Sequence, residues 1–499
     1  MIAPSRLNHR LALAIIAFLP LTGHAAQTSE TSDAPPPATL SLDEAVARAL
    51  ASNFNVRIDR TNTDTARDEA IIADADYTPT FNAAAGVSRD QSAGTFNGTI
   101  FVPGNLFDRT TSRISVSQRV PTGATVSLGG NLNRSERDNI NPAYNSDAFL
   151  SVRQPLLKGA GTAVNLAAIR RSRLGIERAD LDFRGTVLDV VRDVEAAYSR
   201  LVFSRRLLDV RAFSLEVAQK LAEETRAKRD SGVATDLDVL QADVGVANAQ
   251  RDLLLASQNA RDDEDQLLAL FGDRPESEIG PVAFDEPEAA PSVSFARSYK
   301  LALDNFPDHA SAEIAVRQAR IDAGVSRRNR LPTLDISGAL GLNSQEPDAG
   351  TALESLPSGD GYSWQLDISL SVPWGLTADR ARHRQSLANL NRAETRLRQI
   401  DQDILVAVRS AIRAVETNRE NVRISTLATE LSQRQFDLEK ARFNAGLSTF
   451  RRVQEAREDL DTAHVNELQA RINLRVALAD LARLEGSTFE RYNIDLARR

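Results

Sequence analysis

The chain has 499 residues, of which 26% are charged, 42% hydrophobic and 5% aromatic. It contains no cysteine, which excludes a disulfide scaffold and a thiolate metal site. The mean hydropathy of -0.30, with charge spread along the chain, excludes a polytopic helical membrane protein. The net charge of -8 argues against a nucleic-acid-binding protein.

Groups that carry out catalysis or bind metals are sparse. Beyond the N-terminal segment the only histidines are His309, His383 and His464, which are far apart and lack the spacing of metal ligands. No Gly-rich phosphate loop follows a strand pattern, and no Ser/His/Asp set has a recognisable local frame. We therefore expect no enzyme, and we assign no catalytic, cofactor-binding or metal-binding residue and no cofactor.

The N-terminus has the three parts of a secretory signal peptide, which we assign to residues 1–26. Arg6 and Arg10 precede an apolar run over 11–21, and two alanines follow at the expected cleavage site. The run is too short for a membrane-spanning helix. Residues 27–39 are rich in Ser, Thr and Pro without periodicity, which predicts a disordered tether and an exported protein.

The remaining chain consists of two repeats, residues 40–290 and 291–492, followed by a tail over 493–499. Each repeat begins with an amphipathic segment containing Asn-Phe, continues through a Pro-Thr step into a β-like stretch, and ends in a long helical tract broken by one glycine turn. The matched positions, Asn53 with Asn305, Pro79 with Pro332, Gly232 with Gly446 and Gly272 with Gly486, are 252, 253, 214 and 214 residues apart.

The helical tracts predict long rods. Residues 164–228 contain no proline, and roughly 65 helical residues extend about 100 Å. After each turn, apolar and Ala residues recur at steps of three and four, as in a coiled coil. These positions are Val239, Ala242, Val246 and Ala249 in the first repeat, and Val453, Ala456, Leu460 and Ala463 in the second.

The β insertion of the second repeat, 332–373, alternates apolar and polar side chains. A membrane barrel explains such strands when the apolar face contacts lipid and the polar face lines a water-filled lumen. Trp364 and Trp374 are ten residues apart, which is about 33 Å of strand. We therefore predict that these two residues are anchors at the two membrane interfaces.

The β insertion of the first repeat, 79–155, is longer and predicts four membrane crossings. The Asn/Ser/Gly-rich stretches 91–110 and 133–146 are expected to form long external loops. The pattern does not decide whether the extra strand pair joins the barrel wall. With this pair the barrel would have 18 strands, and without it 12.

Taken together, these features resemble the TolC family of outer-membrane efflux proteins. The resemblance extends from Leu40 to about Tyr492 and rests on several motifs: SLDEAVARALASN, the paired Pro-Thr strand starts, the strand ends QPLL and SVPW, and the turns GVATDLDVLQA and GLSTFRRVQEA. It implies an α+β membrane protein: a homotrimer with a β-barrel in the Gram-negative outer membrane, continued by a long α-helical barrel in the periplasm.

The resemblance also implies a function. Such trimers passively conduct substrates outward, as the channel-tunnel of a tripartite efflux or type I secretion system. Their partners are a periplasmic adaptor protein and an inner-membrane pump of RND or ABC type. The exported substrate is not implied.

The same family places its periplasmic tip at the turns containing Gly232 and Gly446. Asp238 matches an aspartate of the family's closing network, whereas Ser448 stands where an arginine is expected. Arg452 and Glu455 stand at the positions of two aspartates.

The double acidic ring is therefore not reproduced. We hypothesise instead that Asp236, Asp238 and Glu455 pair with Arg451 or Arg452 of a neighbouring hairpin to hold the tip closed. The alternative is that these charges only solvate the turns.

The principal alternative function is a periplasmic coiled-coil scaffold or adaptor protein. The helical tracts alone fit it equally well. An adaptor, however, has one helical hairpin within compact β domains, and a duplicated strand–helix order is not expected of it.

Overall fold

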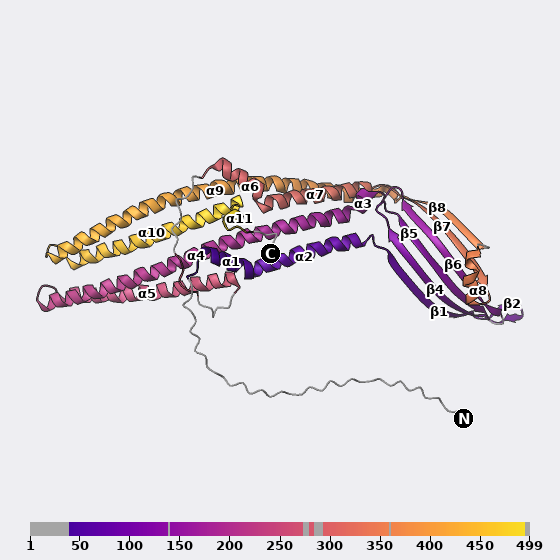
Figure 1. Ribbon diagram of the computed structural model, residues 1–499, viewed down its shortest axis with the longest axis horizontal. Helices are drawn as coiled ribbons and strands as arrows, with labels where there is room; N and C mark the ends of the chain where they lie inside the picture. Colours follow the sequence, from indigo (N-terminus) through magenta and orange to yellow (C-terminus); the bar gives the residue numbers. More distant parts are fainter. Residues whose placement is uncertain (1–38, 138–139, 273–278, 284–292, 359–360, 495–499) are drawn as a thin grey trace, which may run out of the picture.

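The computed structural model describes residues 39–137, 140–272, 279–283, 293–358 and 361–494. The predicted signal peptide, nearly all of the tether and most of the tail lie outside these residues. Helices occupy one end of the elongated molecule and a sheet the other (Figure 1).

Two long helices run from the sheet to the opposite end of the molecule. They are α4 (Ala167–Asp230, 64 residues) and α9 (Thr377–Asn444, 68 residues), each about 100 Å long. Each folds back through a short turn into a 36-residue helix, α5 (Asp236–Phe271) or α10 (Phe450–Glu485). The predicted rods and their glycine turns are confirmed.

Nearer the sheet, α2 (Phe54–Ala75) lies beside α4, and α7 (Pro307–Arg328) lies beside α9. They follow the short helices α1 (Leu42–Ser52) and α6 (Phe295–Asn305). Four helices therefore approach the sheet, in the order α2, α4, α7 and α9.

The Asn-Phe motifs lie where a long hairpin ends and a new helix begins. Asn53 caps α2 by accepting hydrogen bonds from its first amides, and its side chain donates to the carbonyl of Leu270 at the end of α5 (2.8 Å). Asn305 likewise donates to the carbonyl of Glu485 at the end of α10 (3.2 Å). Each asparagine thus joins the ends of two separate helices.

The largest core surrounds the first of these junctions, where α1, α4 and α5 meet around fully buried residues such as Val46, Leu201 and Phe271. At its edge the hydroxyl of Tyr492 donates to the buried carboxylate of Glu195, and Arg491 lies 3.3 Å from the same group. Burial raises the pKa of Glu195, while the hydrogen bond from Tyr492 favours the ionised form.

One antiparallel sheet contains all the long strands of both repeats. Its order is β1 (Thr80–Gln91), β4 (Leu106–Arg119), β5 (Thr125–Arg137), β6 (Ile140–Pro155), β7 (Thr333–Glu346) and β8 (Gly361–Ser371). The short strands β2 (Thr95–Asn97) and β3 (Ile100–Val102) form a separate hairpin between β1 and β4.

The loop expected at 91–110 agrees with residues 92–105, a long connection that contains only the separate β2–β3 hairpin, whereas the loop expected at 133–146 is wrong over its described residues. Strand β4 already begins at Leu106, β5 continues to Arg137, and β6 begins at Ile140. These strand ends are polar, but their backbones pair in register with their neighbours, for example Asn133 with Asn145. A strand that extends beyond the apolar band does not need apolar side chains, so its composition resembles that of a loop.

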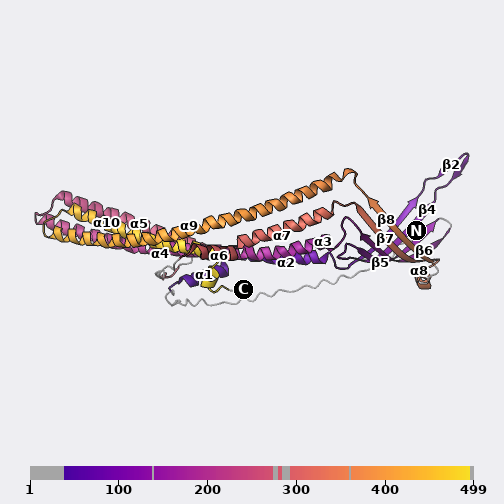
Figure 2. The same cartoon turned by 90° about the horizontal axis from the view of Figure 1, so that it is seen from above.

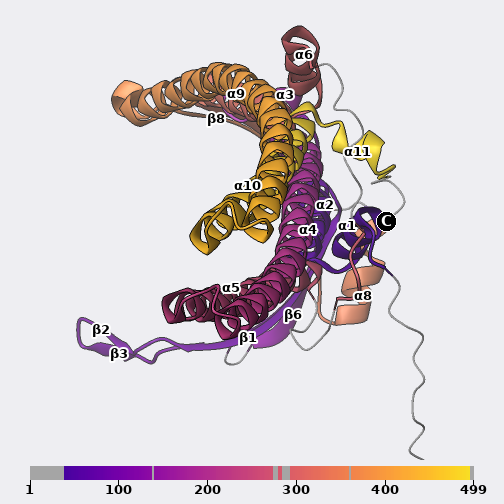
Figure 3. The same ribbon diagram turned by 90° about the vertical axis from the view of Figure 1, so that its left-hand side faces the viewer.

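Seen along the long axis, α9, α10, α4 and α5 lie on an arc (Figure 3), with α1 and α11 (Thr488–Arg491) on its convex side. The two helical hairpins lie side by side at the end away from the sheet (Figure 2). Within the described ranges, no helix is long and apolar enough to cross a membrane.

Candidate functional site

One face of the sheet is apolar across all six strands. A single row of directly paired residues crosses the sheet: Phe81, Val116, Leu128, Leu150, Leu340 and Trp364. These side chains are 41–71% exposed in the single chain. So large an apolar surface on a folded chain needs an apolar neighbour.

Charged pairs end this apolar face toward the β2–β3 end of the strands. Arg89 pairs with Asp108 across β1 and β4 (2.6 Å), and Arg134 pairs with Glu136 along β5 (2.6 Å). By strand alternation all four side chains share the face of Phe81 and Leu128. A charged rim of this kind is expected where an apolar band meets water.

The short helix α8 (Ala349–Glu354) shows which way the apolar face points. Ser146 lies four residues from Leu150 on the same face of β6, and its hydroxyl donates to the carbonyl of Ala352 in α8 (2.5 Å). Helix α8 lies on the convex side of the arc (Figure 3). The apolar face is therefore convex, and the opposite face of the sheet is concave.

The concave face is polar. A hydrogen-bonded ladder crosses three strands: Arg113 donates to Asn131 (2.7 Å), and Asn131 donates to Asp147 (2.6 Å). Nearer the helices, Arg153 pairs with Asp335 across β6 and β7 (2.5 Å). Polar and charged groups without an apolar cover are expected on a surface that faces water.

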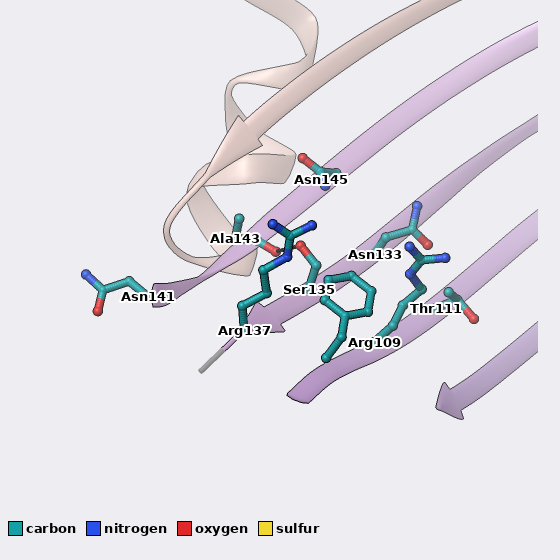
Figure 4. Close-up of a pocket in the computed structure, with 9 residues that line it drawn as sticks. Arg109, Thr111, Asn133, Ser135, Arg137, Asn141, Ala143 and Asn145 are labelled. Carbon is teal, nitrogen blue, oxygen red and sulfur yellow. Dashed lines mark hydrogen bonds between the residues drawn. The ribbon is translucent and has the colours of Figure 1, made fainter. Parts of the chain in front are cut away.

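At the far end of the concave face there is a cavity of about 470 Å³ (Figure 4). Arg109 and Arg137 stack on Phe107, with their guanidinium carbons 5.0 and 5.5 Å from the ring centroid. The remaining lining is neutral and polar apart from one alanine: Thr111, Asn133, Ser135, Asn141, Ala143 and Asn145. Two cationic groups among amides and hydroxyls favour anions. Sequence reasoning missed this cavity because it treated most of these residues as loops.

Of the two tryptophans, one lies within the last strand and the other just beyond its end. Trp364 is on the convex apolar face of β8 and is 71% exposed. Trp374 lies just beyond β8 in a short 3₁₀ helix (Trp374–Leu376) and is fully exposed. Their role as membrane-interface anchors stays a prediction.

At the first tip, the turn between α4 and α5 contains Gly232 with φ +79°, a conformation that favours glycine. Asp238 completes a capping box: its carboxylate accepts from the amide and hydroxyl of Thr235 (2.9 and 2.6 Å), which lowers the pKa of Asp238. Asp236 is highly exposed and lies 3.5 Å from Arg229 of the same hairpin.

At the second tip, Gly446 has φ +73°. Arg451 pairs with Glu455 one turn along α10 (2.8 Å). Arg452 is exposed and faces Glu439 of α9, whose pKa is lowered chiefly by the hydroxyl of Ser448 (2.7 Å), with smaller effects of neighbouring arginines. None of the described ion pairs joins the predicted gate residues of one hairpin to those of the other.

The two tips are held together by apolar contacts instead. Leu221 of α4, Ala242 of α5 and Val453 of α10 share one buried cluster, and Phe443 of α9 packs against it. The ammonium group of Lys228 lies 3.6 Å from the centroid of the Phe443 ring. In the described part of the chain, no group of three potential metal-binding side chains occurs.

The helical contact between the hairpins also contains a charged group that sequence reasoning missed. Arg457 of α10 is 6% exposed and donates to the carbonyl and hydroxyl of Ser214 in α4 (2.9 and 2.6 Å). Asp461 accepts from the same hydroxyl (2.6 Å) and lies 3.7 Å from Arg457. Burial lowers the pKa of Arg457, but its guanidinium remains charged at neutral pH.

A sheet with a convex apolar face and a concave polar face, continued by helical hairpins of about 100 Å, defines an outer-membrane channel protein. The family described as outer membrane efflux protein matches residues 116–273 and 298–487, in two segments. The chain belongs to this family. The predicted fold class, its two repeats and its location in the outer membrane are confirmed.

Among curated relatives, the probable efflux pump outer membrane protein SepC of Pseudomonas putida is 24% identical over 299 residues, which are 58% of this chain and 59% of SepC. The match therefore spans less than two thirds of that relative. The pyoverdine export outer membrane protein OpmQ of Pseudomonas aeruginosa is 24% identical over 67% of this chain and 69% of its own. The solved outer-membrane channel OprN superposes with a TM-score of 0.68 at 19% identity, covering 89% of each chain.

Proposed function

We propose that the protein is the trimeric outer-membrane channel-tunnel of a tripartite efflux or type I secretion system. The observation that carries this proposal is the single sheet with two unpaired edges. Strand β1 has no partner beyond β4, and β8 none beyond β7, among the described strands. Open edges in lipid are not tolerated, so several chains must close one barrel.

The helices support the same assembly. Helices α4 and α9 lie on an arc whose concave side continues the concave polar face of the sheet. Three such arcs enclose a tunnel in line with the barrel lumen. The tunnel is proposed to be a passive conduit without catalytic activity, through which an inner-membrane pump of RND or ABC type delivers its substrate by way of a periplasmic adaptor.

The turns at Gly232 and Gly446 are the proposed contact with the adaptor and the proposed gate. Arg451 pairs with Glu455, Asp238 accepts from Thr235, and Asp236 lies 3.5 Å from Arg229 of its own hairpin. This leaves exposed Arg452 as the better candidate for a link to an acidic group of a neighbouring chain. Each exposed link contributes about 0–1 kcal/mol, so only a symmetric set of three can hold the tip closed.

Electron microscopy of the protein purified from outer membranes tests the assembly. We expect three-fold tubes roughly 130 Å long, with a short wide end and a long narrow stem. Carbonate extraction tests the alternative: a periplasmic scaffold or adaptor is washed off, whereas a barrel stays in the membrane. Monomeric rods released by carbonate would overturn the proposal.

The gate is tested separately by Arg452→Ala. Reconstituted trimers of this variant are expected to leak more small ions than the wild type. Leakage equal to that of the wild type would mean that the charges at the tip only solvate the turns.

A further inference from the structure

We infer that the outer-membrane wall of this trimer contains 18 strands and that the β4–β5 hairpin is a structural part of it. This inference rests on the proposed function, in which three chains close one barrel. Each chain then contributes four strands of its first repeat and two strands of its second repeat to the barrel wall.

The hairpin lies in the interior of the sheet. Strand β4 pairs with β1 from Leu106 to Ser117, and β5 pairs with β6 along nearly its whole length. Strand β1 therefore has no contact with β6 that is independent of the hairpin. If the hairpin were a flap in the lumen or outside the barrel, the remaining four strands would not form one sheet.

Apolar and polar side chains alternate along the β4–β5 hairpin, as expected of two strands in a membrane barrel. Ile114 and Leu128 are 58% and 61% exposed on the convex face, in the same apolar surface as the strands of the second repeat. Their sequence neighbours Ser115 and Ser127 lie on the concave polar face. The two faces of the hairpin thus match lipid and water in the same sense as the faces of β7 and β8.

The turn of the hairpin is fixed to the start of the helical part. The amide of Gly161 donates to the carbonyl of Thr122 (2.9 Å), and the hydroxyl of Thr122 donates to Gln154 at the end of β6 (3.0 Å). Arg119 at the end of β4 donates to Asn165 of α3 (Thr162–Asn165; 2.9 Å). The hairpin is therefore held at the level where β1, β6, β7 and β8 meet the helical part.

The register of the sheet gives the size of the barrel. In the row of directly paired residues that crosses the sheet, Phe81 lies one residue from the helical end of β1 at Thr80. In the same row, Trp364 lies seven residues from the helical end of β8 at Ser371. The helical ends of the strands are therefore displaced by six residues between β1 and β8. This slip corresponds to a strand tilt of about 40°. Eighteen strands at this tilt close a ring about 36 Å across, and twelve would close one of about 24 Å.

The wider ring matches the helices below it. Four helices per chain approach the sheet, and twelve helices spaced by about 9–10 Å form a ring about 36 Å across. The barrel therefore continues the helical tunnel without narrowing. In that case the size of a solute that can pass is limited by the helical tunnel and not by the barrel wall.

The absence of cysteine makes site-directed labelling a clean test. Single cysteines are introduced on the hairpin at Leu128→Cys (convex) and Ser127→Cys (concave), and trimers in liposomes are treated with a charged, membrane-impermeant maleimide. Leu366→Cys and Gln365→Cys of β8 are the matched controls, because β8 lies in the wall for either number of strands.

We expect the concave position of each pair to react at least tenfold faster than its convex neighbour. Equal rates for the two hairpin positions, with alternation preserved on β8, would overturn the 18-strand wall and leave the channel intact. Loss of alternation on β8 as well would overturn the proposed function itself. Eighteen strands in a cross-section of an electron-microscopy map would give independent support.

Discussion

The buried charge between the hairpins gives the sharpest prediction on stability. Arg457 is 7% exposed by its side chain, and its carboxylate partner Asp461 is 18% exposed at 3.7 Å. Removing one partner of a buried pair costs about 3–5 kcal/mol, and the long contact places Asp461→Ala near the lower end, at about 3 kcal/mol. Replacing both partners by apolar residues of similar volume, in the double variant Arg457→Met/Asp461→Leu, leaves neither charge unpaired, so the stability of this double variant should remain within about 1 kcal/mol of the wild type.

Thermal unfolding of the purified protein, followed by the helical circular dichroism signal, measures both variants. Arg451→Met is the matched control, because its pair with Glu455 is exposed and worth about 0–0.5 kcal/mol. The reasoning would be refuted if Asp461→Ala unfolded at the wild-type temperature, or if the double variant lost as much stability as Asp461→Ala. The first outcome would mean that water reaches this contact, and the second that the ion pair stabilises the fold more than apolar packing does.

Three further predictions concern the turn, the core edge and the cavity on the concave face. Gly232→Val should destabilise the first tip by about 1–2 kcal/mol and Gly232→Asn by less, because asparagine tolerates positive φ; amide hydrogen exchange of the turn measures both. Tyr492→Phe should cost about 1.5–3 kcal/mol on the alkaline side of the raised pKa of Glu195, where the carboxylate is ionised, and less on its acid side, in thermal unfolding followed as a function of pH. Arg109→Gln should lower the chloride-to-potassium permeability ratio of reconstituted trimers about twofold at low salt, whereas Arg134→Gln on the convex face should leave it unchanged, as measured from reversal potentials.

The sign for Glu195 follows from its raised pKa. Because the folded protein holds the proton more tightly than the unfolded chain, this group contributes stability at low pH that is lost as the pH rises through its folded pKa. The hydrogen bond from Tyr492 opposes this loss by favouring the ionised form. Its removal is therefore most costly on the alkaline side.

Repetition in the sequence predicted much of the fold. Long helices, glycine turns and alternating strands each have a strong local pattern, and the paired glycines gave the frame of two repeats. The asparagines at 53 and 305 were recognised only as markers of that frame. Their hydrogen bonds to Leu270 and Glu485 join residues 217 and 180 positions apart, and no local pattern predicts such contacts.

Polar side chains were harder to interpret. Residues 133–137 and 140–146 have the composition of a loop, and only their pairing with neighbouring strands makes them part of the sheet. Asp238 was assigned to a gate, whereas within its own chain it caps a helix. Arg457 has no local pattern that predicts its burial, because this burial depends on the α4 surface opposite it. In each case the partner is set by tertiary packing.

The asparagine junctions have a mechanical consequence. Helices α4 and α9 are covalently continuous along the whole helical part. The two other rows of helices, α5 followed by α2 and α10 followed by α7, are each interrupted at one level. There, hydrogen bonds from Asn53 and Asn305 join the ends of separate helices. We therefore expect a twist of the tip to be absorbed at this level, because only the continuous helices α4 and α9 cross it without a break.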